Sequence, residues 1–257
     1  MINPMSLQGK TILVTGAGRG IGQAIAELAV GLGARVAMLD MQGDAVRAAA
    51  GALGADHARA YVGSVTDPAF IQATVEAIVK DFGDLHGLVN NAGITRTAMI
   101  HKMTLEQWNE VIAVNLTGVF ICLQAVGRYF IQKSKQGVAT PGRIVNISST
   151  AGLRGTTGQI NYGAAKSGVL GITMSAAQEW ARYGVTVNSV AFGTVETEMT
   201  EVIRSPRFIE TTMARIPLGR ISTPAEVAQP VCFLLSDAAS YITGQHLSPN
   251  GGSHMAS

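Results

Sequence analysis

The stretch KTILVTGAGRGIG (10–22) joins a short apolar run, a glycine-rich turn and the beginning of an apolar helix. The apolar run has the composition of a buried strand, and the segment GIGQAIAELAVGLG (20–33) has the length of a helix. A second apolar run, ARVAMLD (34–40), predicts another strand. Strand, helix and strand in this order are typical of a βαβ unit, whose two strands run parallel.

The alternation of strands and helices continues along the rest of the chain. Further strands are predicted at ARAYVG (58–63), LHGLVNNAG (85–93), GRIVNISS (142–149), GVTVNSVA (184–191) and GQHLSP (244–249). Helices are predicted at 42–53, from Asp67 as N-cap with Pro68 at the first position, near 104–133 with Thr104 as cap, near 160–182 and from 223. Strands that are apolar on both faces are typical of a parallel sheet covered by helices.

These elements predict an α/β fold, a single-domain Rossmann-like doubly wound sheet of about seven parallel strands with helices on both faces. One dinucleotide-binding and catalytic domain would span 1–257. Its least regular region, about 194–220, follows the end of a strand. Open α/β sheets bind ligands at that edge, so this region is a candidate substrate lid.

The composition limits the classes of protein to consider. Charged residues make up 14% of the 257, against about 25% in a typical soluble domain, which favours surface buried between subunits. The net charge of +2, with Lys and Arg dispersed, argues against nucleic-acid binding. No segment reaches the ~18 uncharged apolar residues of a membrane span, and the N-terminus lacks the pattern of a signal peptide.

The two cysteines, Cys122 and Cys232, each lie in an apolar run far from the other. Their setting predicts buried free thiols rather than a disulfide or a metal pair, and it indicates a reducing cytoplasm. The ending GGSHMAS (251–257) resembles in part the remnant of an added tag, and no function is assigned to it.

The glycine loop predicts a phosphate site. Gly16, Gly20 and Gly22 follow a strand and open a helix, with spacing G-x-x-x-G-x-G. Such a loop lets a phosphate approach the helix N-terminus, whose free N–H groups and dipole favour anions. A plain turn between a strand and a helix is the alternative, and the βαβ context favours the phosphate site.

The residue at the end of the second strand bears on the choice of cofactor. Asp40 stands 20 residues beyond Gly20, where an acid binds the 2′-hydroxyl of an adenosine ribose and repels the 2′-phosphate of NADP. Its alternative role is a helix cap. Arg19 argues weakly the other way because it could meet a phosphate. The sequence therefore predicts NAD.

Tyr162 and Lys166 stand four residues apart in NYGAAKSG (161–168), so they share one helix face. A free tyrosine has a pKa of about 10, and a neighbouring cation favours the phenolate and lowers that value. Tyr162 could then exchange a proton with an alcohol or carbonyl, while Ser149 donates a hydrogen bond to the same oxygen. An ordinary Tyr–Lys surface pair is the alternative.

Asn115 lies inside the apolar segment VIAVNLTG (111–118). A side-chain amide in a helix competes for backbone hydrogen bonds, so Asn115 is expected to bend the helix or to bind a water. A buried amide with its hydrogen bonds satisfied is the alternative. The motif NNAG (90–93) is by itself only a turn signal.

The glycine loop, NNAG, Asn115, Ser149 and YGAAK (162–166) together resemble the short-chain dehydrogenase/reductase family in order and spacing. Ser149 precedes Tyr162 by 13 residues, as in that family, and the resemblance runs from GKTILVTG to YITGQHL. The family implies one Rossmann-like domain that transfers hydride between NAD(P) and an alcohol or ketone. It also implies a homotetramer.

The resemblance implies roles for individual residues. Tyr162 would be the acid–base, Lys166 would lower its pKa and bind the nicotinamide ribose, and Ser149 would polarise the substrate oxygen. Asn115 would hold a water that links Lys166 to solvent. The cofactor-binding positions would be Gly16, Arg19, Gly20, Ile21, Gly22, Asp40, Met41, Ser64, Val65, Asn91, Ala92, Gly93, Tyr162, Lys166, Gly193, Val195 and Thr197. The substrate pocket would draw on Ser149, Arg154, Thr156, Gln159 and Tyr162, and no metal is expected.

Three positions depart from the family pattern. Phe192 stands where the family usually has proline, and it either reshapes the nicotinamide pocket or simply packs there. Ser64 replaces an aspartate that usually reaches the adenine amine. Asn250 replaces an aspartate near the C-terminus, where we expect only a local effect on packing.

Within the family, this chain is similar to the branch of the 3-oxoacyl-carrier-protein reductases, which mostly use NADPH. Asp40 argues against that activity, and so does Tyr183, which replaces an arginine that meets the carrier protein. We therefore expect an NAD(H)-dependent oxidoreductase of a small or medium secondary alcohol, polyol, sugar or ketone, with NADP(H) not excluded. The alternatives are a 3-oxoacyl-carrier-protein reductase using NADPH and a non-catalytic NAD-binding sensor or scaffold.

Overall fold

Seven parallel strands form one sheet in the computed structural model, which describes residues 3–255. The order across the sheet is β3-β2-β1-β4-β5-β6-β7, so the chain reverses its direction of winding between β1 and β4. The strands are β1 (Thr11–Thr15), β2 (Arg35–Asp40), β3 (Ala58–Val62), β4 (Gly87–Asn90), β5 (Gly142–Ser149), β6 (Val185–Phe192) and β7 (His246–Leu247). The predicted doubly wound α/β fold is confirmed.

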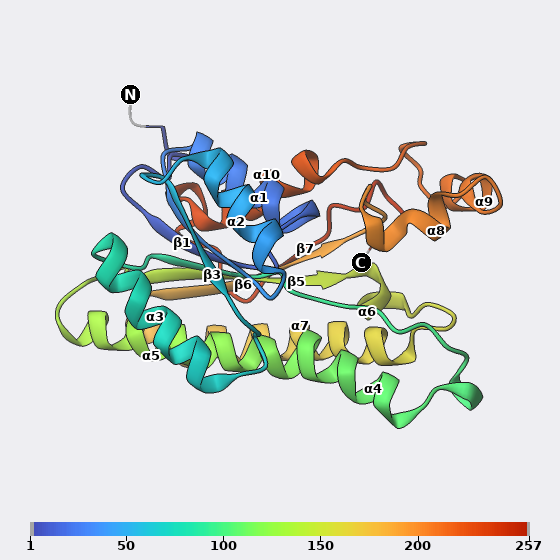
Figure 1. Cartoon of the computed structure of the whole chain (residues 1–257), viewed down its shortest axis with the longest axis horizontal. Coiled ribbons are helices and arrows are strands. Elements are labelled where there is room, and N and C mark those ends of the chain that lie inside the picture. Colours follow the sequence, from blue (N-terminus) through green and yellow to red (C-terminus); the bar gives the residue numbers. More distant parts are fainter. Residues whose placement is uncertain (1–2, 256–257) are drawn as a thin grey trace.

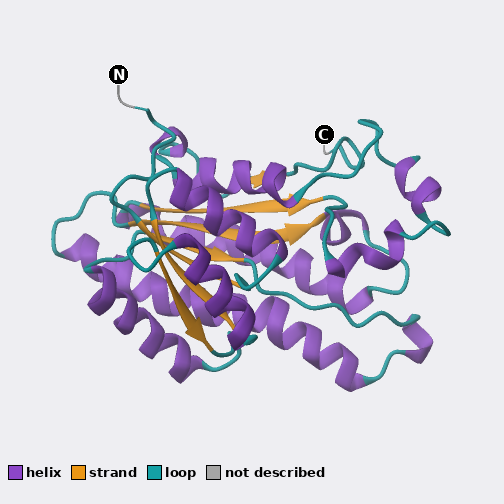
Figure 2. Ribbon diagram, turned by 45° about the horizontal axis from the view of Figure 1, so that its top comes forward, coloured by secondary structure: helices purple, strands orange, loops and turns teal. Residues whose placement is uncertain are grey.

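Helices cover both faces of the sheet (Figures 1 and 2). The helices α1, α2 and α10 lie on one face, and α3, α5 and α7 lie on the other. Their bounds, with those of the short helices, are α1 (Gly20–Gly31), α2 (Gly43–Leu53), α3 (Pro68–Phe82), α4 (Leu105–Ile112), α5 (Gly118–Lys135), α6 (Thr150–Arg154), α7 (Ile160–Trp180), α8 (Glu201–Arg204), α9 (Ile209–Met213) and α10 (Pro224–Leu235). Shorter turns are η1 (Ile100–Lys102), η2 (Ala113–Thr117), η3 (Ala181–Tyr183), η4 (Glu198–Thr200) and η5 (Asp237–Ala239).

Alternate residues of each strand enter two separate cores, as the two-residue period of a strand requires. In β1, Ile12 and Val14 pack under α1 and α10, whereas Leu13 packs against α3 and α5 on the opposite face. All three side chains are almost fully buried. The strands are therefore apolar on both faces, which is why they read as continuous apolar runs in the sequence.

The predicted helix starts and free thiols are confirmed. The Asp67 carboxylate accepts hydrogen bonds from the Ala69 and Phe70 N–H groups, both at 3.0 Å, with Pro68 at the first helical position. Thr104 opens α4 with a capping box. Cys122 and Cys232 are buried and free.

The prediction of one long helix near 104–133 is wrong in its middle. Two helices, α4 and α5, are joined by the wider π-turn η2, which contains Asn115. The side chain of Asn115 explains the break, because both ends of its amide bond the backbone of Ile94 on a neighbouring loop. The predicted bend at Asn115 is thus present as a π-turn, and the amide is buried and satisfied.

The combined segment Leu105–Lys135 is long and apolar enough to cross a membrane when judged by length and composition alone. Half of its most apolar 18-residue window is buried inside the protein. Its second part, α5, packs against β4, β5 and α7, so its apolar face already has partners within the chain. A core helix passes the same test of length and composition.

The irregular region 194–220 folds into short pieces beside the carboxyl edge of the sheet. It contains η4, α8 and α9, which project beyond the sheet on the right of Figure 1. A single bridge between Val195 and Ser222 closes the base of this region. Met199 and Val202 expose half or more of their side chains on it. Its role as a substrate lid stays a prediction.

Candidate active site

The carboxyl ends of β1 and β4 meet at the point where the winding of the sheet reverses. Three hydrogen bonds hold the two ends together: the Thr15 hydroxyl accepts from the N–H groups of Asn91 (3.0 Å) and Ala92 (3.1 Å) and donates to the Val89 carbonyl (3.3 Å). The Asn91 amide also donates to the Gly16 carbonyl at 3.0 Å. Asn91 of NNAG (90–93) thus holds the glycine loop against the end of β4. No pattern in the sequence predicted that Thr15 would join the ends of β1 and β4.

The glycine loop has the geometry that a dinucleotide phosphate needs. Gly16 has φ +64°, and a Cβ on Gly22 would lie 2.1 Å from the Gly16 carbonyl oxygen, so both positions require glycine. The helix α1 begins with no side-chain cap and no acidic residue in its first turn. Its N-terminus is therefore available to an anion, and the loop fits a nicotinamide dinucleotide.

Asp40 lies at the end of β2 with its carboxylate turned toward the glycine loop. One oxygen accepts from the Gly18 N–H and the other from the Gln42 N–H, both at 3.0 Å. The carboxylate thus braces two turns and places a negative charge beside the loop. Met41 follows it with 70% of its side chain exposed.

The other predicted cofactor positions have the following contacts and burial. Gly93 faces the Asn115 amide, and Thr197 faces Gly20, to whose built Cβ its methyl group would lie at 3.6 Å. The Ser64 hydroxyl bonds the Thr66 hydroxyl at 2.8 Å. Four more positions are packed: Ile21 against the core, Val65 and Val195 buried, and Gly193 close to Asn250.

Ser149 and Tyr162 meet at the carboxyl edge of the sheet, from the end of β5 and the first turn of α7. Burial raises the pKa of Tyr162, and the neighbouring Ser149 hydroxyl lowers it by a smaller amount. The Ser149 oxygen also accepts from the Ala151 N–H at 3.2 Å, which opens the short helix α6. The alternative of an ordinary surface pair does not fit this setting.

Lys166 is buried, with 3% of its surface exposed, and its Nζ lies 5.7 Å from the centre of the Tyr162 ring. Nζ donates to the Ile147 carbonyl at 2.7 Å, and burial lowers the pKa of Lys166 to about 8. The lowering of the Tyr162 pKa by Lys166 stays a prediction. Burial dominates, and the phenol keeps its proton above the ordinary tyrosine value.

The small residues between Tyr162 and Lys166 serve the packing of α6 on α7. A Cβ on Gly163 would lie 3.3 Å from the Ala151 carbonyl oxygen. On the facing helix, a Cβ on Gly152 would lie 2.6 Å from the Lys166 carbonyl carbon. The Ser148 hydroxyl adds a bond to the Lys166 carbonyl oxygen at 2.9 Å. The backbone around the pair is thereby held on two sides.

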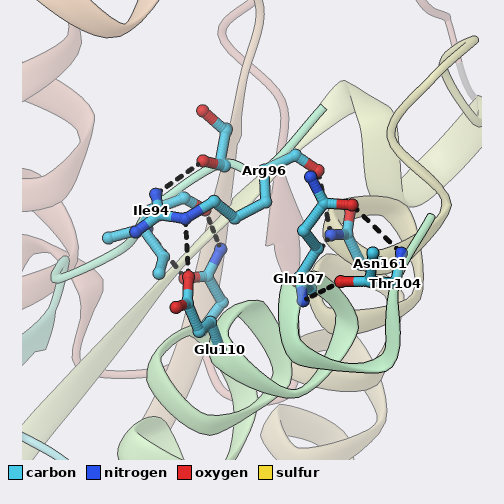
Figure 3. Close-up of polar contacts among 8 residues, drawn as sticks. Ile94, Arg96, Thr104, Gln107, Glu110 and Asn161 are labelled. Carbon is cyan, nitrogen blue, oxygen red and sulfur yellow. Dashed lines mark hydrogen bonds and ion pairs between the residues drawn. The ribbon is translucent and has the colours of Figure 1, made fainter. Parts of the chain in front are cut away.

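Asn161, which the sequence did not single out, positions the start of α7. Its buried amide donates to the carbonyls of Arg96 and Gln107, both at 3.0 Å, and its carbonyl accepts from the Tyr162 N–H at 2.8 Å. Figure 3 shows it among the contacts of the loop that leads into α4. The only sign of this role in the sequence is an asparagine directly before Tyr162.

The residues predicted for the substrate pocket are spread over the α6–α7 loop. The exposed Arg154 donates to the Ser253 carbonyl at 3.0 Å, and the Thr156 hydroxyl bonds its neighbouring carbonyl. Gln159 precedes α7 without a side-chain cap. Only Ser149 and Tyr162 of the predicted set lie against each other. Residues 3–255 contain no group of three or more His, Cys, Asp or Glu that could hold a metal.

The departures from the family pattern have structural explanations. Phe192 is 4% exposed and belongs to the core on the α1 side, so it packs rather than opening the pocket. The Asn250 side chain bonds Ser248, Gly252 and His254, and so it folds the turn after β7. Its effect is local, as expected.

A glycine loop at the reversal point, with Ser, Tyr and Lys at the same edge of the sheet, defines a nucleotide-dependent oxidoreductase. The family model for enoyl-(acyl carrier protein) reductases matches residues 16–254. The 3-oxoacyl-[acyl-carrier-protein] reductase FabG of Vibrio cholerae is 44% identical over 251 residues, 98% of this chain and all of the relative. The chain belongs to the short-chain dehydrogenase/reductase family and is an oxidoreductase that binds a nicotinamide cofactor.

Two solved structures share the fold over nearly their whole length. A short-chain dehydrogenase/reductase from Mycobacterium marinum superposes with a TM-score of 0.91 at 29% identity, covering 98% of each chain. A candidate NAD(P)-dependent gluconate 5-dehydrogenase from Beutenbergia cavernae, with NADP bound at low occupancy, gives 0.90 at 37% identity, covering 98% and 99%. The FabG relative favours the carrier-protein alternative over the general alcohol dehydrogenase expected from the sequence.

Proposed function

We propose that this oxidoreductase reduces the keto group of a 3-oxoacyl thioester carried by acyl carrier protein. The observation that carries the proposal is the placement of Ser149 beside Tyr162 at the carboxyl edge of the sheet, where burial raises the pKa of the phenol and keeps it protonated at neutral pH. A protonated phenol is the acid that reduction of a ketone needs. The FabG relative, matched over its whole length, supports the thioester as substrate.

Each site residue would have its own role in the reduction. A reduced nicotinamide, when bound, supplies the hydride for the carbonyl carbon. Tyr162 donates its proton to the carbonyl oxygen, and Ser149 donates a hydrogen bond that orients the same oxygen. Lys166 stabilises the phenolate that remains, since its ammonium lies on the face of the ring. The π-turn at Asn115 packs against α7, the helix that carries Lys166, and a water held there would link Lys166 to solvent.

We expect rapid oxidation of the reduced cofactor with acetoacetyl-acyl carrier protein, slower turnover with acetoacetyl coenzyme A, and little with secondary alcohols in the reverse direction. The measurement is absorbance of the reduced nicotinamide, with a Tyr162→Phe protein as the control. Turnover of alcohols or sugar acids with no thioester reduction would contradict the proposal.

The surface near η3 bears on the carrier protein. Tyr183 stands in place of an expected arginine, but Arg182 beside it stacks its guanidinium 4.8 Å from the centre of the Tyr183 ring. A cation therefore remains on this surface. Equal rates with the carrier-bound and coenzyme A thioesters would leave the ketone chemistry intact and remove the carrier protein as partner.

For the cofactor we propose NAD(H), on the position of Asp40. Its carboxylate is fixed beside the loop by Gly18 and Gln42, so a 2′-phosphate would meet a negative charge there. The Beutenbergia relative, with NADP bound, supports the opposite choice. NAD(H) and NADP(H) would bind at the same site.

Asp40→Ala should weaken NADH binding about ten-fold, or 1.4 kcal/mol, and bring the Kd values of NADH and NADPH together. The loss follows from removal of the acceptor for the ribose 2′-hydroxyl. Isothermal titration calorimetry measures both affinities, and Asp44→Ala, an exposed acid of α2, is the matched control. Tighter binding of NADPH than of NADH by the natural chain would overturn the choice of NAD(H).

A second candidate function is an NAD(P)-dependent dehydrogenase of a sugar or sugar acid. The specific observation in its favour is the 37% identity to the candidate gluconate 5-dehydrogenase over 98% of this chain. We further propose a cytoplasmic location, which the two buried free thiols support, and a homotetramer, which the low charged fraction supports.

A further inference from the structure

An ion pair connects the glycine loop to the region 194–220. The Arg19 guanidinium, in the residue before α1, contacts the carboxylate of Glu198 in η4, which lies 179 residues further along the chain. Both side chains are more than half exposed.

The turn that carries Glu198 is held in place independently of the ion pair. The Thr200 hydroxyl donates to the carbonyls of Val195 (2.5 Å) and Thr197 (3.0 Å). Arg204 donates to the Thr197 carbonyl at 3.2 Å, so the next helix is tied to the same turn. The carboxylate is thus presented to the glycine loop by a built turn rather than by a loose one.

Arg19 stands next to the position where the two dinucleotides differ. It follows Gly18, whose N–H binds the Asp40 carboxylate, so the backbone of Arg19 lies one residue from the contact with Asp40. Two successive residues of the glycine loop thus contact carboxylates: Gly18 contacts Asp40, and Arg19 contacts Glu198. A 2′-phosphate would need the guanidinium, since arginine binds phosphate through paired charged hydrogen bonds.

We propose that Glu198 is a specificity-determining residue for the cofactor, which acts by engaging Arg19 and so withholding it from the 2′-phosphate of NADP(H). The same contact links the candidate lid to the cofactor loop. This inference rests on the proposed placement of the adenosine ribose beside Asp40. It assigns Glu198 a positioning role, in which the residue touches neither substrate nor the reacting atoms.

Glu198→Gln should tighten NADPH binding about three- to five-fold, which is the range that an exposed ion pair can contribute, and leave NADH binding within two-fold. Calorimetric titration of each dinucleotide measures the ratio of the two Kd values. Glu201→Gln is the matched control, because Glu201 is an exposed acid of the same region for which residues 3–255 provide no ion pair. It removes the same charge without freeing Arg19, so the ratio should stay unchanged.

A double-mutant cycle with Arg19→Gln decides whether Glu198 acts through the arginine. In the Arg19→Gln background, Glu198→Gln should no longer change the NADPH affinity. In the natural background, Glu198→Asp keeps the carboxylate, so its ratio of the two Kd values should lie between those of the natural protein and Glu198→Gln. An effect that persists without Arg19, an equal change for both dinucleotides, or the same change in Glu201→Gln would overturn the inference.

Failure of the cofactor placement gives a different result from failure of this inference. If Asp40→Ala leaves the affinity for both dinucleotides unchanged, the placement of the ribose is wrong and the role of Glu198 falls with it. If Asp40→Ala changes the ratio as expected and Glu198→Gln does not, only the role of Glu198 is wrong. Reduction of the thioester is not needed for either measurement.

Discussion

Tyr162→Phe should lower kcat by about 10²–10⁴-fold while the protein stays folded and binds its cofactor. The substitution removes one oxygen atom and keeps the ring that faces the Lys166 ammonium at 5.7 Å. The substrate oxygen then has no acid to receive a proton from, and Ser149 alone can only donate a hydrogen bond. Steady-state rates with the thioester substrate measure the loss.

The control for this prediction is Tyr241→Phe, since Tyr241 is fully exposed and distant in sequence from the site. Circular dichroism and the Kd of the reduced cofactor show whether the fold and the cofactor site remain. A Tyr162→Phe protein that keeps more than a tenth of the natural kcat would exclude Tyr162 as the proton donor, whatever its cofactor affinity.

Much of the fold was predictable because its signals are local. Each strand is a short apolar run, and each run lies between helix-length segments. Caps such as Asp67 and Thr104 depend on hydrogen bonds two or three residues away, which a sequence displays directly. The rules for parallel crossovers limit the possible orders of the strands, and the observed order comes from the structure.

The π-turn between α4 and α5 was not predictable from local signals. Asn115 inside an apolar segment indicated an irregular helix. Its hydrogen-bond partner, however, is the backbone of Ile94, 21 residues away on a loop. Only the fold brings that loop beside the helix. The contact between Arg19 and Glu198 was not predictable either, because it joins two exposed residues that lie 179 positions apart in the chain.

The spacing of Tyr162 and Lys166 predicts a lowered pKa for the phenol, whereas burial in the packed chain raises it. The spacing of Tyr162 and Lys166 gives their shared helix face, but it gives nothing on how much water each group loses. In the structure both groups lose water, which raises the pKa of Tyr162 and lowers that of Lys166. Burial is a property of the packed chain, so this balance depends on α6 and β5 as much as on α7.

The burial of Lys166 leads to the second large effect. Lys166→Met should lower kcat by about 100-fold or more, because the phenolate formed by proton transfer loses its neighbouring cation. Methionine keeps most of the length of the side chain and fits an apolar surrounding. The loss of rate should therefore come without loss of the fold.

Stability should change in the opposite direction to activity. The pKa of Lys166 falls from its ordinary 10.5 to about 8 in the folded chain, so below pH 8 the buried ammonium costs folding about 3 kcal/mol. Between pH 8 and 10.5 the unfolded chain binds more protons than the folded chain, so the free energy of unfolding of the natural protein rises with pH in that window. Lys166→Met lacks this rise.

The difference in unfolding free energy between the two proteins isolates the lysine, because every other titrating group is common to both. Urea unfolding at several values from pH 7 to 10.5 should show the methionine protein gaining most over the natural protein near pH 7 and losing that gain as pH rises. The bond from Nζ to the Ile147 carbonyl is lost at every pH, so it shifts the whole difference without changing its slope. A difference that stays flat across this window would mean that Lys166 keeps an ordinary pKa, and the rate loss would then need another cause than a cation held beside the phenol.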